Sequence, residues 1–149
     1  MDNKEEYSLN FLKDQYAKNN HFYNYLGIKL EKAYRGHAVQ TMEVVFGKHT
    51  NLYGYIHGGA IMSIGDTCMG IACASLGKKV VTVDTNINFI KNVKAPAIVK
   101  AEAQVVHNGR KTIVMGAKLY NAQGEVLSAM RATFYVIGVF EELLQLQSD

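Results

Sequence analysis

The stretch IHGGAIMSIGDTCMGIACASLG, residues 56–77, decides the fold of this chain. It is apolar on nearly every side and contains many small, unbranched residues, which favours a buried helix over a strand. Gly77 follows at the position where glycine commonly ends a helix. Gly65 and Gly70 each cost about 1 kcal/mol relative to alanine inside a helix, so we expect another element to pack against the backbone at both positions.

Asp66 lies at the centre of this apolar stretch, which is otherwise long enough to cross a membrane. A carboxylate at that depth costs about 2.5 to 3.5 kcal/mol on insertion scales, and the rest of the chain alternates like the sheet of a soluble protein. We therefore predict that the protein has no membrane-spanning segment and no membrane partner.

Alternating polar and apolar residues lie on both sides of the predicted helix. Two strands are predicted before it and four after it, over residues 26–31, 37–46, 80–91, 97–107, 111–120 and 125–137. The pair Asn108-Gly109 is a strong signal for a hairpin turn between the fourth and fifth strands. Because a long helix that is apolar all round must be wrapped by other elements, we predict an α+β fold. In it, a strongly curved antiparallel sheet of about six strands surrounds one central helix.

The length of the chain, 149 residues, is typical of one domain, and 48% of its residues are apolar. We predict a single domain over residues 1–149. Residues 1–25 are predicted to be an N-terminal helical extension, because apolar side chains recur at helical spacing from Tyr7 to Tyr25. Residues 139–149 are predicted to be a C-terminal tail or a short terminal helix.

The charge balance bears on the partners of the protein. Lysine and arginine number 16, aspartate and glutamate 13, and the net charge of +3 is spread along the chain. This is too little for an electrostatic nucleic-acid binder, but it suits an anionic small molecule. The histidines at 21, 37, 49 and 107 lack the spacing to cysteines or carboxylates that is typical of metal ligands, so we predict no metal site.

Cys68 and Cys73 are five residues apart in the predicted helix, where their side chains point in different directions and cannot bridge. We predict two free thiols in the core. The first residues, MDNKEE, lack the basic-then-apolar order of a signal peptide. Together these features predict a reducing, cytoplasmic location.

Two features of the predicted helix are suited to chemistry. At its start, His57-Gly58-Gly59, unpaired backbone amides can hold an oxyanion, although a simple tight turn is the alternative. Asp66 can be a general base or a nucleophile, or only a structural partner for a hydroxyl or an amide. Nine residues of helix separate His57 from Asp66 by about 13 Å and place them on opposite sides. A reaction that uses both features therefore needs two subunits.

Asn51, His57-Gly58-Gly59, Asp66 and residues 82–87 (TVDTNI) together resemble the hotdog-fold thioesterases, in particular their phenylacetate-pathway, PaaI-like branch. The resemblance covers residues 26–137. It implies a curved six-stranded antiparallel sheet around one helix, paired into a homodimer with active sites between subunits and often doubled into a homotetramer. It also implies hydrolysis of an acyl-CoA thioester to free acid and CoA, with CoA as part of the substrate and no separate cofactor.

The resemblance implies a role for each residue of this group. Gly58 supplies the amide that polarises the thioester carbonyl, and His57 and Asn51 shape that end of the site. Asp66 of the partner subunit is the catalytic acid, acting as general base or as nucleophile. Thr82 helps to place the water.

Further residues are implied in binding the substrate. Basic residues concentrate in two loops whose cations can pair with the phosphates of CoA, although a solvated charged turn is the alternative for each. The other positions lie beside the helix start or along the path of the pantetheine arm. The full set is Gly59, Asp84, Phe89, Lys91, Asn92, Lys94, Asn108, Gly109, Arg110 and Lys111.

Strand alternation raises a difficulty for Thr82. It places Thr82 on the same side as Asp84 and Asn86, opposite Val83 and Ile87. We therefore expect a bulge or a subunit interface to explain how Thr82 reaches the site.

The nature of the acyl group stays open between aryl-acetyl and medium-chain groups, and Met62, Met69 and Tyr53 are candidates for the wall of its pocket. Two alternatives to an enzyme also remain. One is a non-catalytic acyl-CoA or lipid-binding hotdog protein, which has no need of a costly buried acid at Asp66. The other is an oligomerisation module, which predicts no pocket.

Overall fold

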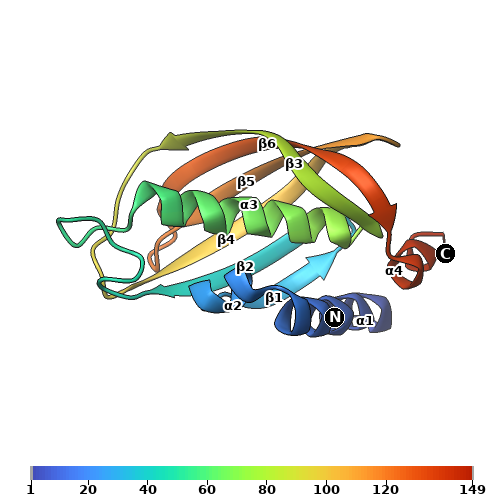
Figure 1. The fold of residues 1–149 in the computed structure, drawn as a ribbon, viewed down its shortest axis with the longest axis horizontal. Helices are drawn as coiled ribbons and strands as arrows, with labels where there is room; N and C mark the ends of the chain where they lie inside the picture. The colour runs from blue at the N-terminus through green and yellow to red at the C-terminus, as the bar shows by residue number, and fades with distance from the viewer. Residues whose placement is uncertain (1, 149) are drawn as a thin grey trace.

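The computed structural model describes residues 2–148 of the chain. Within these residues, six antiparallel strands form one curved sheet, and a long helix lies along its inner face (Figure 1). The strands lie in the order β1-β2-β4-β5-β6-β3, so β1 and β3 are the two edges of the sheet. The elements are α1 (Asn3–Asn19), α2 (His21–Leu26), β1 (Lys29–Tyr34), β2 (His37–Val44), α3 (Gly58–Ala74), β3 (Lys78–Phe89), β4 (Ala97–Asn108), β5 (Thr112–Tyr120), β6 (Val126–Val139) and α4 (Glu141–Leu146).

The central helix α3 forms the middle of the core. Its residues Ile64, Met69 and Ile71 have no exposed surface, because the curved sheet covers them. His57 caps the start of the helix, and Gly77 follows its end with a φ of 83°. Neither α3 nor any other helix within residues 2–148 is long and apolar enough to cross a membrane. The predicted α+β architecture, a curved six-stranded antiparallel sheet around one helix, is confirmed.

The two glycines inside α3 have different surroundings. A Cβ atom at Gly65 would lie 2.0 Å from Sδ of Met130 on β6, so β6 packs against the helix backbone there, as predicted. A Cβ atom at Gly70 would meet only the ring of Phe134, at 4.0 Å. The prediction of close packing is therefore wrong at Gly70, because the helix faces open space at that position.

The N-terminal extension consists of two helices, not of the single helix predicted over residues 7–25. The break lies at Asn20, whose side-chain oxygen accepts a hydrogen bond from the N–H of Tyr23 at 2.9 Å. Asparagine favours a cap over a helix interior because its side chain competes for backbone groups. The first helix is attached to β1, where Ser8 Oγ donates to the carbonyl of Ala33 at 2.6 Å.

The tightest hairpin joins β1 to β2. Arg35 and Gly36 form a two-residue loop with φ angles of 49° and 78°, and a type I′ turn requires such positive values. Asn108, in contrast, is the last paired residue of β4, and Gly109 lies in a longer loop. Neither has a positive φ. The hairpin predicted at Asn108-Gly109 is therefore present, and its loop is longer than the two-residue loop between β1 and β2.

Cys68 and Cys73 are buried and unbridged. Burial raises the pKa of the Cys73 thiol to about 12 and also raises the pKa of the Cys68 thiol well above its usual value. The Cys68 thiol donates to the carbonyl of Ala38 at 3.5 Å. Both cysteines therefore stay protonated core residues at neutral pH.

Candidate active site

The start of α3 leaves one backbone amide available. Nδ1 of His57 accepts a hydrogen bond from the N–H of Gly59 at 2.8 Å. No acceptor within residues 2–148 engages the N–H of Gly58. First-turn amides lie at the positive end of the helix dipole, so this N–H can stabilise a developing negative charge. The acceptor role of Nδ1 also places the proton of a neutral His57 ring on Nε2.

The loop before α3 is shaped by Asn51. Its side-chain oxygen accepts hydrogen bonds from the N–H groups of Tyr53 at 2.9 Å and Tyr55 at 3.1 Å. Asn51 and Gly58 line a cavity of about 340 Å³. Phe89, Lys91 and Asn92 line the same cavity. Four of the predicted site residues outside the helix start, Asn51, Phe89, Lys91 and Asn92, are thus brought to the Gly58 amide.

His49 connects this loop to the N-terminal helices. Its buried ring accepts a hydrogen bond from the N–H of Val45 through Nδ1, at 2.9 Å, and donates through Nε2 to the carbonyl of Leu26, at 3.0 Å. Its own carbonyl accepts a hydrogen bond from the N–H of His57 at 2.8 Å. Burial lowers the pKa of His49 below its usual value, and nearby Lys48 also lowers it, against the opposing effect of the Leu26 carbonyl. The neutral ring therefore supports the start of α3.

We expect the protein to lose stability as the pH falls below the unfolded-state pKa of histidine, about 6.5. In that range the unfolded chain binds a proton at His49 that the folded chain resists, so the free energy of unfolding decreases as the pH falls. Melting temperatures between pH 7.5 and pH 5.5 should fall by a few degrees, and His49→Gln should flatten this slope while lowering stability at every pH. The matched control is His21→Gln, which changes an exposed histidine on α2. An equal slope in the His49 variant would contradict the prediction.

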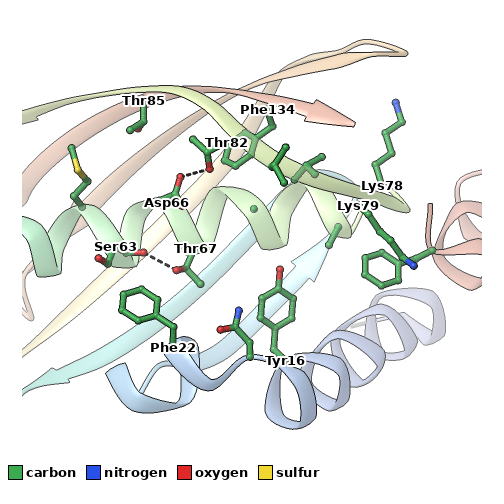
Figure 2. A pocket seen from close by; sticks show the side chains of 17 residues that line it. Tyr16, Phe22, Ser63, Asp66, Thr67, Lys78, Lys79, Thr82, Thr85 and Phe134 are labelled. Carbon is green, nitrogen blue, oxygen red and sulfur yellow. Dashed lines mark hydrogen bonds between the residues drawn. The ribbon is translucent and has the colours of Figure 1, made fainter. Parts of the chain in front are cut away.

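Asp66 lies midway along α3 and has a hydroxyl partner. Thr82 Oγ1 on β3 donates to Asp66 Oδ1 at 2.9 Å. The carboxylate is only partly buried, because it borders a second cavity, of about 600 Å³ (Figure 2). Asp66 thus has the hydroxyl partner that a structural role requires, and it also borders the open space that a catalytic role requires.

A bulge in β3 brings Thr82 to this position. Thr82 pairs with Phe134 and Asp84 pairs with the preceding residue of β6, Thr133, so Val83 is an extra residue in β3. Side chains change faces at such a bulge. Thr82 and Thr85 consequently both line the Asp66 cavity. Of the two expected explanations, a bulge or a subunit interface, the structure shows the bulge.

The Gly58 and Asp66 sites are separate within one chain. Gly58 precedes Asp66 by eight residues, about 12 Å of helix. Each residue lines its own cavity, and no residue within 2–148 lines both. The structure therefore agrees with the expectation that the two features do not meet in one chain.

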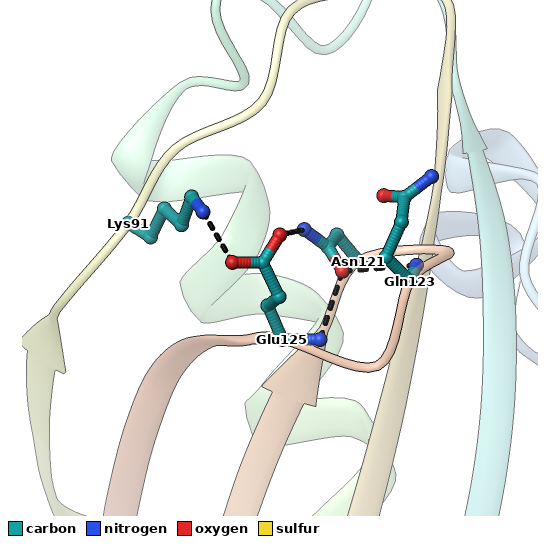
Figure 3. Close-up of polar contacts among 4 residues, drawn as sticks. All are labelled: Lys91, Asn121, Gln123 and Glu125. Atoms are coloured by element: carbon teal, nitrogen blue, oxygen red, sulfur yellow. Dashed lines mark hydrogen bonds and ion pairs between the residues drawn. The ribbon is translucent and has the colours of Figure 1, made fainter.

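Lys91 has a carboxylate partner that the sequence did not indicate. Its Nζ forms a short ion pair with Glu125 at the end of the β5–β6 loop (Figure 3). The pKa of Glu125 is lowered by its hydrogen bonds from Lys91 and from Asn121, which donates at 3.1 Å. Lys94 instead lies over the ring of Tyr55, 5.1 Å from its centre.

The remaining predicted substrate-binding residues lie elsewhere in the chain. Lys78, just after the C-terminal end of α3, donates to Asn108 Oδ1 at 2.6 Å and to the carbonyl of Gly109 at 2.8 Å. Arg110 and Lys111 are exposed in the same loop, at the opposite end of α3 from Gly58. Asp84 is exposed on β3 and lines neither of the two cavities at Gly58 and Asp66. A single chain does not bring these residues to Gly58 or Asp66, and their roles stay predictions for the assembled protein.

The N-terminal helices contribute residues that the sequence did not indicate as site residues. Tyr16, Asn20 and Phe22 line the Asp66 cavity (Figure 2). The spacing of Tyr16 and Phe22 in the sequence indicated only an apolar helix face, because the place where the N-terminal helices pack depends on the whole fold. Of the three residues suggested for an acyl pocket wall, Met62 lines this cavity. Met69 is fully buried in the core, and Tyr53 is 74% exposed in the loop.

Comparisons with known proteins agree with this geometry. A family model described as the thioesterase superfamily matches residues 53–128, about half of the chain. This chain belongs to the thioesterase superfamily. The prediction that this chain belongs to a family of thioesterase enzymes is therefore confirmed.

Relatives and solved structures place this thioesterase in the PaaI-like branch. The acyl-coenzyme A thioesterase PaaI of Escherichia coli (strain K12) is 33% identical over 113 residues, which are 76% of this chain and 80% of that protein. The structure of E. coli PaaI from the phenylacetic acid degradation operon matches with a TM-score of 0.83 and 28% identity, covering 90% of this chain and 96% of that one. The predicted hotdog fold is confirmed.

A thioesterase from Streptococcus pneumoniae TIGR4, solved with coenzyme A, matches with a TM-score of 0.72 and 32% identity. The match covers 75% of this chain and 90% of that one. Two further structures of a thioesterase from that strain carry alanine in place of an aspartate and of a threonine. Those two positions are separated by 16 residues, as are Asp66 and Thr82.

Proposed function

We propose that this thioesterase hydrolyses acyl-CoA thioesters to a free acid and CoA, at sites shared by two protomers. The observation that carries the proposal is Asp66, held by Thr82 at the edge of a cavity, on the same helix whose start leaves the Gly58 amide unpaired. The named relative that acts on acyl-coenzyme A and the streptococcal structure with coenzyme A support the substrate class.

The Gly58 amide stabilises the negative charge that develops on the thioester carbonyl oxygen. Preorganised backbone donors have their largest effect when charge appears in the transition state. His57 holds the neighbouring amide of Gly59, so the oxyanion is directed to Gly58 alone. Asn51 keeps the preceding loop in place.

Asp66 of the partner subunit either removes a proton from the attacking water or attacks the carbonyl carbon itself. The Thr82 hydroxyl orients the carboxylate through Oδ1, which leaves Oδ2 toward the substrate. In the first route water adds to the carbonyl carbon and the CoA thiolate leaves. In the second route the thiolate leaves as an acyl anhydride forms on Asp66, and water then hydrolyses this anhydride to the free acid and the original carboxylate. The chain's own groups carry out each step, and CoA enters only as part of the substrate.

The shared site requires at least a homodimer, and a homotetramer is the expected assembly. The edge strand β3 supports this, because its outer backbone groups have no neighbouring strand within residues 2–148. Val81 and Val83 on β3 are also 49% and 63% exposed. In such an assembly, Lys94 and the loop of Arg110 and Lys111 provide cations for the phosphates of CoA. A reducing cytoplasm suits the free thiols and this substrate.

The test is release of free thiol from a panel of acyl-CoA esters that includes acetyl, octanoyl and phenylacetyl groups. We expect enzyme-dependent hydrolysis of at least one ester with kcat/KM of about 10⁴ M⁻¹s⁻¹ or more. Binding of the esters without thiol release would instead indicate a non-catalytic acyl-CoA-binding protein. Sizing chromatography completes the test, because a strictly monomeric active enzyme contradicts the shared site.

A further inference from the structure

The cavity at Asp66 continues as a groove along α3. Its floor consists of Ser63, Thr67, Gly70 and Ala74, which are spaced by four, three and four residues and therefore share one face of the helix. All four are small, so the helix backbone lies close to the open space. The groove starts beside Asp66 and runs toward the C-terminal end of α3 (Figure 2).

Two different parts of the chain form the walls. Phe22 and Tyr16, from the N-terminal helices, lie on one side, and Thr82 and Phe134, from the sheet, lie on the other (Figure 2). Burial raises the pKa of the Tyr16 phenol well above its usual value, so this wall carries no charge at neutral pH. At the far end, Nζ of Lys79 lies 5.0 Å from the centre of the Phe140 ring. Along most of its length the groove therefore presents rings and small side chains, and Lys78 and Lys79 line its end away from Asp66 (Figure 2).

We infer that this groove holds the acyl part of the substrate, and that Gly70 and the wall formed by the N-terminal helices select a medium-chain acyl group. The inference rests on the proposed function, since Asp66 marks where the thioester carbonyl lies. From Asp66 to Ala74 the helix advances about 12 Å. An extended chain advances roughly 1.2 Å per bond, so the groove accommodates a linear acyl chain of about ten carbons.

Gly70 determines the usable length of the groove. It lies one helical turn beyond Asp66, about 6 Å along the axis. A side chain at this position would enter open space, because its Cβ would have only the Phe134 ring within 4.0 Å. A larger residue would therefore block the groove beyond the first few carbons without disturbing Asp66 or Thr82.

The first experiment measures kcat/KM for octanoyl-CoA and acetyl-CoA with the unmodified enzyme and with Gly70→Leu. We expect the octanoyl-to-acetyl ratio to fall at least about tenfold, because the lost chain contacts extend over several methylene groups. Leucine favours a helix more than glycine does, so the substitution should not impair folding. The matched control is Ala17→Leu, which adds the same side chain at an exposed position of α1 next to Tyr16. Its ratio should equal that of the unmodified enzyme.

The second experiment tests the wall with Phe22→Ala and Tyr25→Ala. Both aromatic residues are on α2, with exposed fractions of 56% and 62%, but of the two only Phe22 lines the groove. We expect Phe22→Ala to raise KM for octanoyl-CoA while kcat changes little, because the chain contacts are equal in the ground and transition states. Tyr25→Ala should leave both constants unchanged.

An unchanged octanoyl-to-acetyl ratio in Gly70→Leu would overturn the inference, as would equal effects of the two α2 variants. If the unmodified enzyme is active, either result rejects only the assignment of the groove to the acyl group. The proposed hydrolysis of acyl-CoA is then unaffected. An unmodified enzyme that hydrolyses no acyl-CoA ester would reject the proposed function, and the inference with it.

Discussion

Asp66→Asn is expected to lower kcat for acyl-CoA hydrolysis by about 100-fold to 10,000-fold. The amide can neither take a proton from water nor attack the carbonyl at a useful rate. The oxygen of asparagine can still accept the Thr82 hydrogen bond, which is 2.9 Å long in the structure. The fold and the melting temperature should therefore change little. The measurement is free-thiol release under saturating substrate, together with a thermal melt.

Asp14→Asn is the matched control for this experiment. Asp14 is an exposed carboxylate on α1 that pairs with Lys18 at 3.0 Å and lines neither cavity. It tests whether losing a surface negative charge affects the assay. Undiminished turnover in Asp66→Asn would remove Asp66 from the mechanism and favour its structural role beside Thr82.

Gly58→Pro is expected to lower kcat by about 100-fold to 1,000-fold relative to Gly58→Ala. Gly58 is the first residue of α3, where proline is well tolerated, and His57 before it is already extended, with φ of −67° and ψ of 138°. Proline therefore removes the N–H that is proposed to hold the oxyanion while the helix still forms. Alanine keeps this N–H and adds the same Cβ, which lies 3.2 Å from the Phe89 ring in both variants. The comparison isolates the hydrogen bond from the steric change.

Mixing the two defective proteins tests whether the site is shared. In a mixed dimer of Asp66→Asn and Gly58→Pro chains, one site carries both defects and the other carries neither. Random pairing makes half of the dimers mixed, so roughly one quarter of the unmodified activity should return on co-expression. Activity no greater than that of the separate variants would show that Gly58 and Asp66 serve different sites, and would contradict the proposed mechanism.

Local periodicity explains why much of the site could be predicted. The identity of α3 as a buried helix follows from a run of small apolar residues, and the opposite placement of His57 and Asp66 follows from about 100° of rotation per residue. These inferences needed only neighbours along the chain.

Other features depended on contacts between distant residues. The partner of Lys91, Glu125, lies 34 residues away, and no spacing rule connects them. Gly65 and Gly70 look alike in the sequence, yet Met130 packs against one while the other faces the groove. A similar limit applies to Tyr16 and Phe22, whose role depends on how the N-terminal helices dock.

The sequence by itself determined the central helix, its start at His57-Gly58-Gly59 and the position of its single acid, because side-chain direction within a helix follows from residue spacing alone. Only the tertiary structure decided that Thr82 reaches Asp66 and that a groove extends beyond them. One extra residue in β3 changes which face each later side chain occupies, and the pairing of β3 with β6 sets where that residue lies. The groove exists because packing leaves space above Gly70, and such a space depends on elements that meet only in the folded chain.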